Sequence, residues 1–349
     1  MNIDVRAVLL CSAMAMLFSA GCGSKSNGSK IASNSCTTNT NCSHVQICKN
    51  GSCVAPVYIV TATGIAIDNS GNVWVTNRIN STVTELNSSG ITIETNSVGP
   101  DPSGIAIDSS GNIWIVNLSG NNVTKFSSSG VTIGTYDVGT EPNGIAIDSS
   151  GNVWVTNQGD DTVTKLNSSG TVIGTYSVGA RPWDIAIDST GNVWVTNSHS
   201  NNVTELNASG TTIGTYSVGT YPYGIAIDSS NNVWVAAGGA SIVTKLNSNG
   251  ITIGTYNVGP GPEGIAIDST GNVWVTNYGY NTVTELNSSG TIIGTYKVGF
   301  GPWGIAIDAS GNAWITDPSS NLLFEFVGVA KGPQYWPYTG PQFPGGGNF

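Results

Sequence analysis

Positive charge is scarce in this chain. Lys and Arg together number 11 in 349 residues, against 21 Asp and Glu, and the formal net charge is −10. Phosphate-binding surfaces need clustered Lys and Arg, so the composition argues against a nucleic-acid partner. Histidine occurs only at His44 and His199, which leaves little for proton-transfer chemistry. Thr, Ser, Asn and Gly take the exposed positions instead, as is typical of a protein built from strands and turns.

Long apolar runs are also missing, apart from one near the N-terminus. Arg6 precedes an apolar run over residues 7–20, about the length of a signal-peptide core and too short to span a bilayer. The run ends in Ser-Ala-Gly-Cys at residues 19–22, which resembles a bacterial lipobox. We therefore predict a signal peptide over 1–21, lipidation at Cys22, and an outer-membrane or cell-surface lipoprotein whose only membrane contact is this lipid. Ordinary secretion, with Cys22 left as a free thiol, is the alternative.

Cysteine is concentrated in one short segment. Four of the six cysteines fall within eighteen residues, at Cys36, Cys42, Cys48 and Cys53. Residues 22–35 before them are rich in Ser, Gly, Asn and Lys and predict a flexible tether. A stretch this short cannot bury a core, so we predict a module over 36–55 with two disulfides, formed in an oxidising compartment. Three pairings are possible, and a zinc site is the alternative, although no C-x-x-C pair is present.

The rest of the chain repeats itself every forty residues. The phrase Ile-Ala-Ile-Asp begins at Ile65, Ile105, Ile145, Ile185, Ile225, Ile265 and Ile305. The first six copies hold four short strand-like segments and the seventh holds three. We therefore predict an all-β, seven-bladed β-propeller of four-stranded antiparallel blades over residues 56–330, a monomer, with a Pro/Gly/aromatic tail over 331–349. Only six copies contain the fourth strand, so Pro56–Val60 is expected to complete the last blade and close the ring.

Comparison of the copies separates the repeated frame, meaning the residues that most copies share, from positions that vary. Seven of the ten tryptophans share one second-strand position and predict blade-to-blade packing: Trp74, Trp114, Trp154, Trp194, Trp234, Trp274 and Trp314. The repeated Asp, first at Asp68, predicts a turn cap rather than a calcium ligand. The third-strand charges predict a solvated outer rim: Glu85, Lys125, Lys165, Glu205, Lys245, Glu285 and Glu325.

Variation concentrates in two loops, one from strand four to the next strand one and the other between strands two and three. In a four-stranded blade both loops reach the same face of the disc, and aromatic side chains gather there. The predicted ligand-binding residues are Trp183, Asp184, Tyr221, Tyr223, Tyr278, Tyr280, Phe300 and Trp303. Such side chains suit stacking on a glycan or peptide ligand, or contact with an envelope protein. The alternative is that they pack over neighbouring loops and plug the channel. No metal site is predicted.

One further pattern carries a family resemblance. Residues 142–157 read Pro-Asn-Gly-Ile-Ala-Ile-Asp-Ser-Ser-Gly-Asn-Val-Trp-Val-Thr-Asn, which resembles NHL-repeat and streptogramin (virginiamycin B) lyase-like propellers. The resemblance implies elimination chemistry on a cyclic depsipeptide, with a His and with carboxylates holding magnesium. Here the family's Trp-Phe-Thr-Glu is Trp-Val-Thr-Asn, and His199 is the sole catalytic candidate in the propeller.

We therefore expect a binding module without a cofactor. A lyase-like enzyme that uses His199, nearby carboxylates (Asp160, Asp161, Asp184 and Glu263) and magnesium is one alternative. A purely structural envelope protein is the other.

Overall fold

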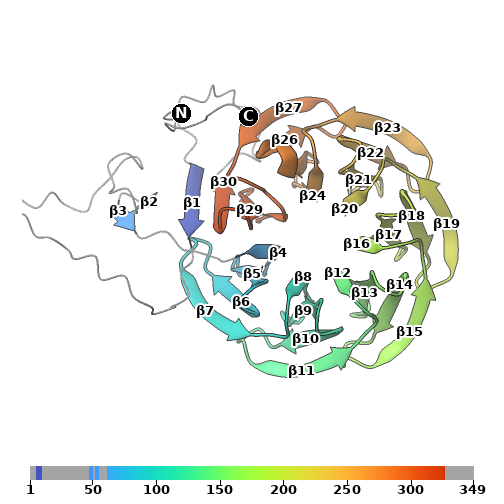
Figure 1. Ribbon diagram of the computed structural model, residues 1–349, viewed down its shortest axis with the longest axis horizontal. Helices are drawn as coiled ribbons and strands as arrows, with labels where there is room; N and C mark the ends of the chain where they lie inside the picture. Colours follow the sequence, from blue (N-terminus) through green and yellow to red (C-terminus); the bar gives the residue numbers. More distant parts are fainter. Residues whose placement is uncertain (1–4, 10–46, 50–51, 55–60, 327–349) are drawn as a thin grey trace, which may run out of the picture.

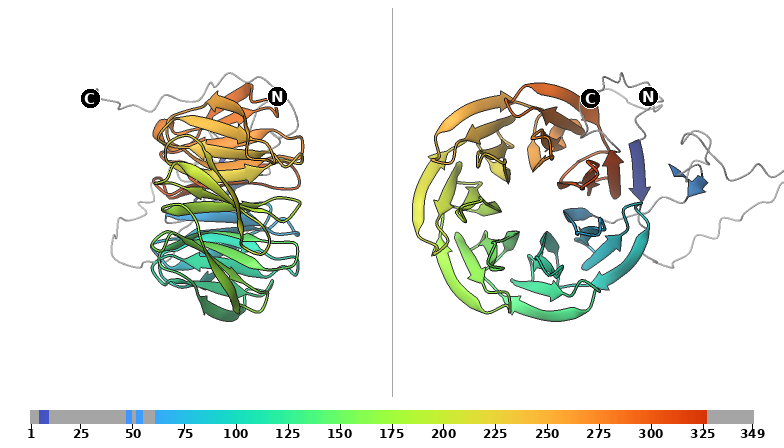
Figure 2. Two further views of the ribbon diagram at one scale, coloured as in Figure 1. Left: turned by 90° about the vertical axis from the view of Figure 1, so that its right-hand side faces the viewer. Right: turned by 180° about the vertical axis from the view of Figure 1, so that it is seen from behind.

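The computed structural model describes residues 5–9, 47–49, 52–54 and 61–326. Seven four-stranded antiparallel sheets stand radially around a central axis (Figure 1). Seen from the side, the ring is a flat disc (Figure 2). The predicted all-β fold of seven four-stranded blades is therefore confirmed. Within the described residues, the search for a helix of the length and apolarity needed to span a membrane finds none.

Each blade runs outward from the axis through four strands. The innermost strands are β4 (Ala62–Ile67), β8 (Pro102–Ile107), β12 (Pro142–Ile147), β16 (Pro182–Ile187), β20 (Pro222–Ile227), β24 (Pro262–Ile267) and β28 (Ile305–Ile307). The second strands are β5 (Val73–Asn77), β9 (Ile113–Asn117), β13 (Val153–Asn157), β17 (Val193–Asn197), β21 (Val233–Ala237), β25 (Val273–Asn277) and β29 (Ala313–Asp317). A 3-10 helix, η2 (Tyr278–Tyr280), follows β25.

The two outer positions complete the blades. The third strands are β6 (Thr82–Leu86), β10 (Asn122–Phe126), β14 (Thr162–Leu166), β18 (Asn202–Leu206), β22 (Ile242–Leu246), β26 (Thr282–Leu286) and β30 (Leu322–Phe326). The outermost strands of the first six blades are β7 (Thr92–Ser97), β11 (Thr132–Asp137), β15 (Val172–Ser177), β19 (Thr212–Ser217), β23 (Thr252–Asn257) and β27 (Ile292–Lys297).

The last blade takes its fourth strand from the beginning of the chain. Strand β1 (Val5–Leu9) pairs antiparallel with β30, in register Ala7 opposite Phe324. The predicted closing strand, Pro56–Val60, lies outside the described residues. Strands β2 (Ile47–Lys49) and β3 (Ser52–Val54) form a separate hairpin in which Cys48 stands opposite Cys53. The other two cysteines of the predicted module, the predicted lipidation residue Cys22, and the predicted tail also lie outside the described residues.

The repeated Trp and Asp form a continuous inner layer of the frame. All seven second-strand tryptophans are fully buried, which confirms their packing role. Each indole N–H donates to the turn Asp of its own blade, as Trp154 does to Asp148 Oδ2 at 3.1 Å. The other Asp148 oxygen caps the turn by accepting the N–H groups of Ser150 and Asn152. Burial alone would raise the pKa of Asp148, but these hydrogen bonds lower it below its usual value.

The third-strand charges are buried, so the prediction of a solvated outer rim is wrong. All seven are less than 10% exposed: Glu85, Lys125, Lys165, Glu205, Lys245, Glu285 and Glu325. Each faces the Trp side of its own blade, as the pairing of Trp154 with Lys165 shows.

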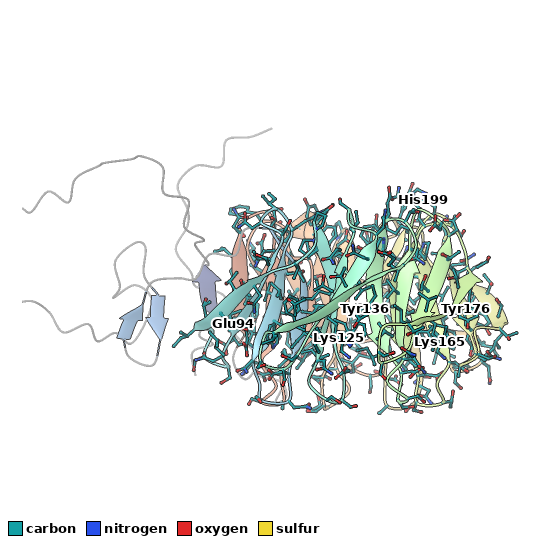
Figure 3. All side chains as sticks on the ribbon, turned by 90° about the horizontal axis from the view of Figure 1, so that it is seen from below. Glu94, Lys125, Tyr136, Lys165, Tyr176 and His199 are labelled. Carbon is teal, nitrogen blue, oxygen red and sulfur yellow. The ribbon has the colours of Figure 1, made fainter. Side chains whose placement is uncertain are left out.

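Buried partners explain why these charges are tolerated. The Lys165 ammonium lies 4.6 Å from the centroid of the Trp154 ring and donates to the Ala208 carbonyl of the next blade at 2.8 Å. Glu205 instead accepts from Asn192 and from the Tyr216 hydroxyl. Figure 3 shows that Lys125 and Lys165 hold corresponding places in adjacent blades. The three buried lysines therefore link their blades to the next one, whereas the partners of Glu205 lie in its own blade.

Replacement of Lys165 by Met is expected to lower the free energy of unfolding by about 1–3 kcal/mol. The variant keeps the apolar stem but loses the hydrogen bond to Ala208, the contact with the Trp154 ring and the 3.8 Å ion pair with Asp148. Urea unfolding followed by Trp fluorescence measures the effect. Lys297→Met is the matched control, because Lys297 is exposed on the outermost strand β27 and is expected to change stability by less than about 0.5 kcal/mol. Equal losses in both variants would contradict the buried role.

Candidate functional site

The two variable loops of each blade are joined to one another at one face of the disc. In the third blade, the N–H of Gln158 donates to the carbonyl of Glu141 at 3.0 Å. In the fourth, the N–H of Ser198 donates to the carbonyl of Arg181 at the same distance. Equivalent bonds occur in the first, second, fifth and sixth blades, so the prediction that both loops reach the same face is confirmed there.

A bulge in six of the seven inner strands aims side chains at the axis; in the seventh blade β28 begins at Ile305, after the equivalent residues Trp303 and Gly304. In β16 the pairing with β17 joins Pro182 to Asn197 and then resumes at Ile185, which leaves Trp183 and Asp184 outside the ladder. The same irregularity occurs in β4, β8, β12, β20 and β24. Because bulges redirect side chains, the residue after each Pro turns toward the channel. The backbone carbonyl of this residue accepts a hydrogen bond from the previous blade. For example, Thr156 Oγ1 donates to Trp183 O at 3.0 Å.

The second bulge position is Gly in every blade except the fourth, where it is Asp184. The inner strands approach one another closely at these glycines. A Cβ built on Gly224 would lie 2.3 Å from the carbonyl oxygen of Glu263, and one on Gly264 would lie 2.4 Å from that of Trp303. Asp184 therefore occupies a position that the close approach of the inner strands reserves for Gly in the other six blades. Exceptions of this kind concentrate at functional sites.

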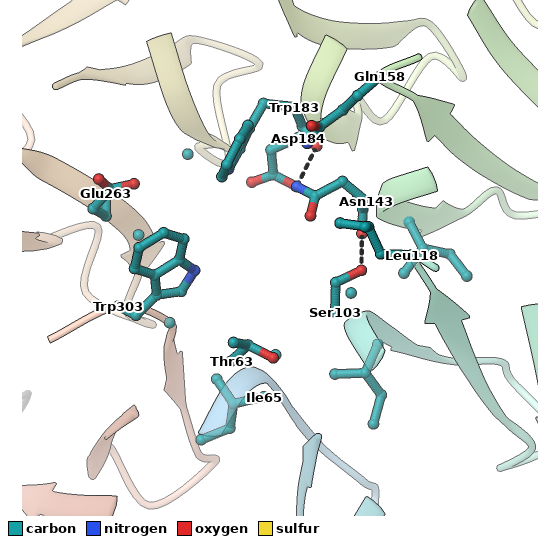
Figure 4. Close-up of a pocket in the computed structure, with 18 of the residues that line it drawn as sticks. Thr63, Ile65, Ser103, Leu118, Asn143, Gln158, Trp183, Asp184, Glu263 and Trp303 are labelled. Carbon is teal, nitrogen blue, oxygen red and sulfur yellow. Dashed lines mark hydrogen bonds between the residues drawn. The ribbon is translucent and has the colours of Figure 1, made fainter. Parts of the chain in front are cut away.

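The first bulge positions form a ring around the axis, and they divide it into two unlike sides. The seven residues are Thr63, Ser103, Asn143, Trp183, Tyr223, Glu263 and Trp303. The first three are small and polar, and the last four are aromatic or acidic. All except Tyr223 line an axial cavity of about 470 Å³, a size that suits a small organic ligand. Figure 4 shows Trp183, Glu263 and Trp303 facing Thr63, Ser103 and Asn143 across it.

Aromatic rings form a connected cluster beside this cavity. The Trp183 ring lies edge-on to Tyr223, with centroids 4.9 Å apart, and 6.3 Å from Trp303, although these residues come from different blades. Tyr278 meets Trp303 edge-on at 6.0 Å. Trp183 and Trp303 are only partly buried, because they border the cavity. Their apolar surface is therefore open to a ligand on the axis.

The fifth blade has unusually small residues behind this cluster. Its second strand ends in Ala236-Ala237 and Gly238 follows, and every other blade carries larger residues at these three positions. Gly239 is shared with the third and sixth blades, at Gly159 and Gly279. A Cβ on Gly238 would lie 2.6 Å from Tyr223 Cε2, and a Cβ on Gly239 would lie equally close to Tyr221 Cδ2. The small residues therefore make room for the two tyrosine rings.

Two carboxyl groups that border the cavity, those of Glu263 and Asp184, have raised pKa values. Protein atoms surround both groups densely on the sides away from the cavity. Burial raises the pKa of Glu263 to about 8. Burial also raises the pKa of Asp184 to about 6, although Asp184 accepts hydrogen bonds from the N–H groups of Ile185 and Ile225, which favour the charged form. Both groups are thus poised to change protonation when a charged ligand arrives.

The arginines at the cavity already have acidic partners. Arg78 forms a two-pronged ion pair with Asp101. Arg181 lies 3.7 Å from Glu141 and donates to Gln158 Oε1 at 3.2 Å. The cavity therefore presents carboxylates on its aromatic side and neutralised arginines near the loops.

The predicted ligand-binding residues fall into two groups. Trp183, Asp184 and Trp303 line the cavity, with Tyr223 and Tyr278 packed against the two tryptophans. The other group does not line it and is exposed on the loop face: Tyr221 (49%), Tyr280 (68%) and Phe300 (73%).

The candidate catalytic residue His199 lies apart from the cavity lining. It is exposed on the loop face, where its ring meets that of Tyr221 at 6.2 Å (Figure 3). Asp160 caps the Thr140 backbone and side chain, and Asp161 accepts the N–H of Arg181. The structure therefore brings Asp184 and Glu263 to one cavity but places His199, Asp160 and Asp161 elsewhere. Among the described residues, His, Cys, Asp and Glu form no cluster suited to a metal ion.

The asparagines that replace the family's Glu belong to the frame. Asn77, Asn117, Asn157, Asn197 and Asn277 are at most 4% exposed. Their amide groups donate to third-strand side chains, as Asn157 does to Thr162 and Thr164. These amides hold strands two and three together and do not reach the cavity.

Fold and site together define a seven-bladed propeller with an axial cavity beneath one variable loop face. The chain belongs to the virginiamycin B lyase family, which it matches over residues 53–243. Two of the structures that it resembles are lyases at a TM-score of 0.71, and the chain is covered to 77% in each comparison. One is a streptogramin B lyase, 21% identical over 94% of its own chain. The other is a catalytically inactive virginiamycin B lyase from Staphylococcus aureus with quinupristin, 19% identical over 95%.

The fold also occurs outside the lyases. Kuenenia stuttgartiensis hydrazine synthase aligns with a TM-score of 0.67, at 15% identity, over 80% of this chain and 99% of its own. A comparison with curated proteins gave no sequence match. At these identities the structural likeness shows the fold, and the activity has to be argued from the site.

Proposed function

We propose that this propeller is a ligand-binding module whose ligand occupies the axial cavity. The observation that carries the proposal is the divergence of the seven equivalent bulge positions. The frame repeats almost unchanged, yet the residues that line the cavity range from Thr63 to Trp303. Packing alone would be satisfied by the same residue in each blade. Partly exposed Trp rings beside a ligand-sized cavity are a usual feature of binding sites.

The test is a search for ligands with the purified full chain. Glycan and peptide arrays, followed by mass spectrometry of bound species, are run for the wild type and for Trp303→Ala, with and without magnesium. A ligand captured by the wild type and lost from the variant supports binding in the cavity. Capture that is unaffected by Trp303→Ala would place binding elsewhere, and no capture by any class would favour a structural role in the envelope.

Lyase-like elimination is the second candidate, because the chain belongs to this family. Ring opening of a cyclic depsipeptide by elimination needs a positioned base, and the inactive S. aureus lyase carries a histidine replacement. His199 is the sole His in the described part of the chain, and it lies outside the cavity lining. Incubation with quinupristin and magnesium tests the idea. Elimination yields a linear product of unchanged mass but altered retention, and its loss in His199→Ala would establish this activity.

We also propose that the chain is exported and anchored by a lipid at Cys22, on the strength of the apolar run and the Ser-Ala-Gly-Cys ending. Removal of residues 1–21 would take β1 away from β30, and Pro56–Val60 remains our proposed replacement at that edge. The intact mass of the chain recovered from bacterial membranes tests both the removal of residues 1–21 and the lipidation of Cys22. A diacylated mass that begins at Cys22 supports anchoring, whereas an unprocessed N-terminus would contradict it.

A further inference from the structure

The axial cavity contains acidic and aromatic groups without a cation to accompany them. Among the described residues Glu263 has neither a hydrogen-bond donor nor an ion-pair partner, and burial is the sole cause of its raised pKa. Asp184 is met by two backbone N–H groups. The lining cations, Arg78 and Arg181, pair with Asp101 and Glu141 instead. A partly buried carboxylate without a protein partner is costly to ionise, so the cavity favours a cationic ligand.

The frame of this same chain shows what such a site accepts. In three blades an ammonium group lies over a Trp ring, with a carboxylate close by. Lys125, Lys165 and Lys245 are 4.4–4.6 Å from their Trp centroids and 3.6–3.9 Å from an Asp oxygen. The axial cavity repeats the Trp and the carboxylate but lacks the ammonium.

We propose that the axial cavity binds a small organic cation, with its alkylammonium group against the Trp183 and Trp303 rings and Glu263 as the counter-charge. This inference rests on the proposed binding function and specifies its ligand class. Aromatic rings attract such cations most strongly where water is excluded, and quaternary ammonium groups suit them because they are weakly hydrated. The opposite side, with Thr63, Ser103 and Asn143, is polar: their side chains donate to inner-strand carbonyls, which leaves side-chain oxygens to accept a hydrogen bond from a polar tail.

The experiment compares two probes of equal shape and different charge. Isothermal titration of the full chain at about pH 8 uses choline and its uncharged carbon isostere, dimethylbutanol. Choline is expected to bind at least about tenfold more tightly, because only the cation gains the cation–π and ionic attraction. Glu263→Gln should reduce that preference several-fold, and the Trp183 and Trp303 rings account for the remainder. Asp137→Asn is the matched control, because it removes an exposed carboxylate from the outer strand β11 and should preserve the preference.

Each outcome decides the inference. Equal affinity for both probes, or no choline binding by a folded wild type, would overturn the cation assignment. A preference that is undiminished in Glu263→Gln would overturn the role of Glu263, provided that the melting temperature and near-UV circular dichroism show a native fold. If choline fails while a glycan or peptide still binds in a Trp303-dependent manner, the binding function stands and only this inference falls.

Discussion

Replacing Trp183 and Trp303 together by alanine is expected to weaken choline binding about 100-fold. Each ring lines the cavity, and a desolvated cation–π contact contributes about 1–2 kcal/mol. Loss of two such contacts removes about 3 kcal/mol, which corresponds to roughly two decades in Kd. The two rings also contact one another, so the double variant avoids leaving one Trp to collapse into the space of the other. Isothermal titration measures the change in Kd.

The matched control is Tyr280→Ala with Phe300→Ala. These aromatics are the most exposed of the predicted ligand-binding set, on the same loop face, and neither lines the cavity. We expect their removal to leave choline binding within about twofold of wild type. If this control weakens binding as much as the Trp pair does, the ligand lies on the loop face rather than on the axis. If the Trp variant loses its cooperative unfolding transition, the two rings act mainly in packing.

The sequence predicted the frame well because the frame is periodic. A Trp and an Asp that recur every forty residues must perform the same local task in each blade, and the structure gives that task as an indole N–H bound to a turn cap. Burial of the third-strand charges was not predictable in the same way. Lys165 finds its carbonyl acceptor at Ala208, forty-three residues later, in a different blade. Local alternation of polar and apolar residues carries no information on such a partner.

The sequence predicted the face of the disc that carries the candidate site, but it did not predict the axial cavity. Sequence comparison located the variable loops, yet it grouped Trp183 with Tyr280 and Phe300, which the structure separates. The missing element was the bulge, since two residues outside the ladder decide which side chains turn to the axis. A signal was present in the sequence: the residue after each Pro varies freely, while the next is Gly in every blade except the fourth. That pattern would have placed Glu263 among the cavity residues.

Stability is expected to fall as pH rises, because of Glu263. Its pKa is about 8 in the folded protein, against an ordinary value of 4.5. Between these values the folded state holds a proton that the unfolded chain has lost, so the free energy of unfolding declines with pH. The contribution is complete below about pH 4.5 and lost above about pH 8. Asp184 acts with the same sign between about 3.8 and 6. Each group limits the slope to about 1.4 kcal/mol per pH unit.

Urea unfolding between about pH 5 and pH 9 measures this slope, and Glu263→Gln should flatten it above pH 6, where Asp184 has already ionised. Glu141, Arg78 and Arg181 also border the cavity, where Arg181 pairs with Glu141 and Arg78 with Asp101. An unchanged slope in the variant would contradict the assignment. Choline affinity should show the opposite trend and rise toward pH 8, because the carboxylate that destabilises the empty cavity is the one that attracts the cation. Ionisation of Glu263 thus lowers the stability of the ligand-free protein and strengthens choline binding. Bound choline should therefore offset part of the stability lost at high pH.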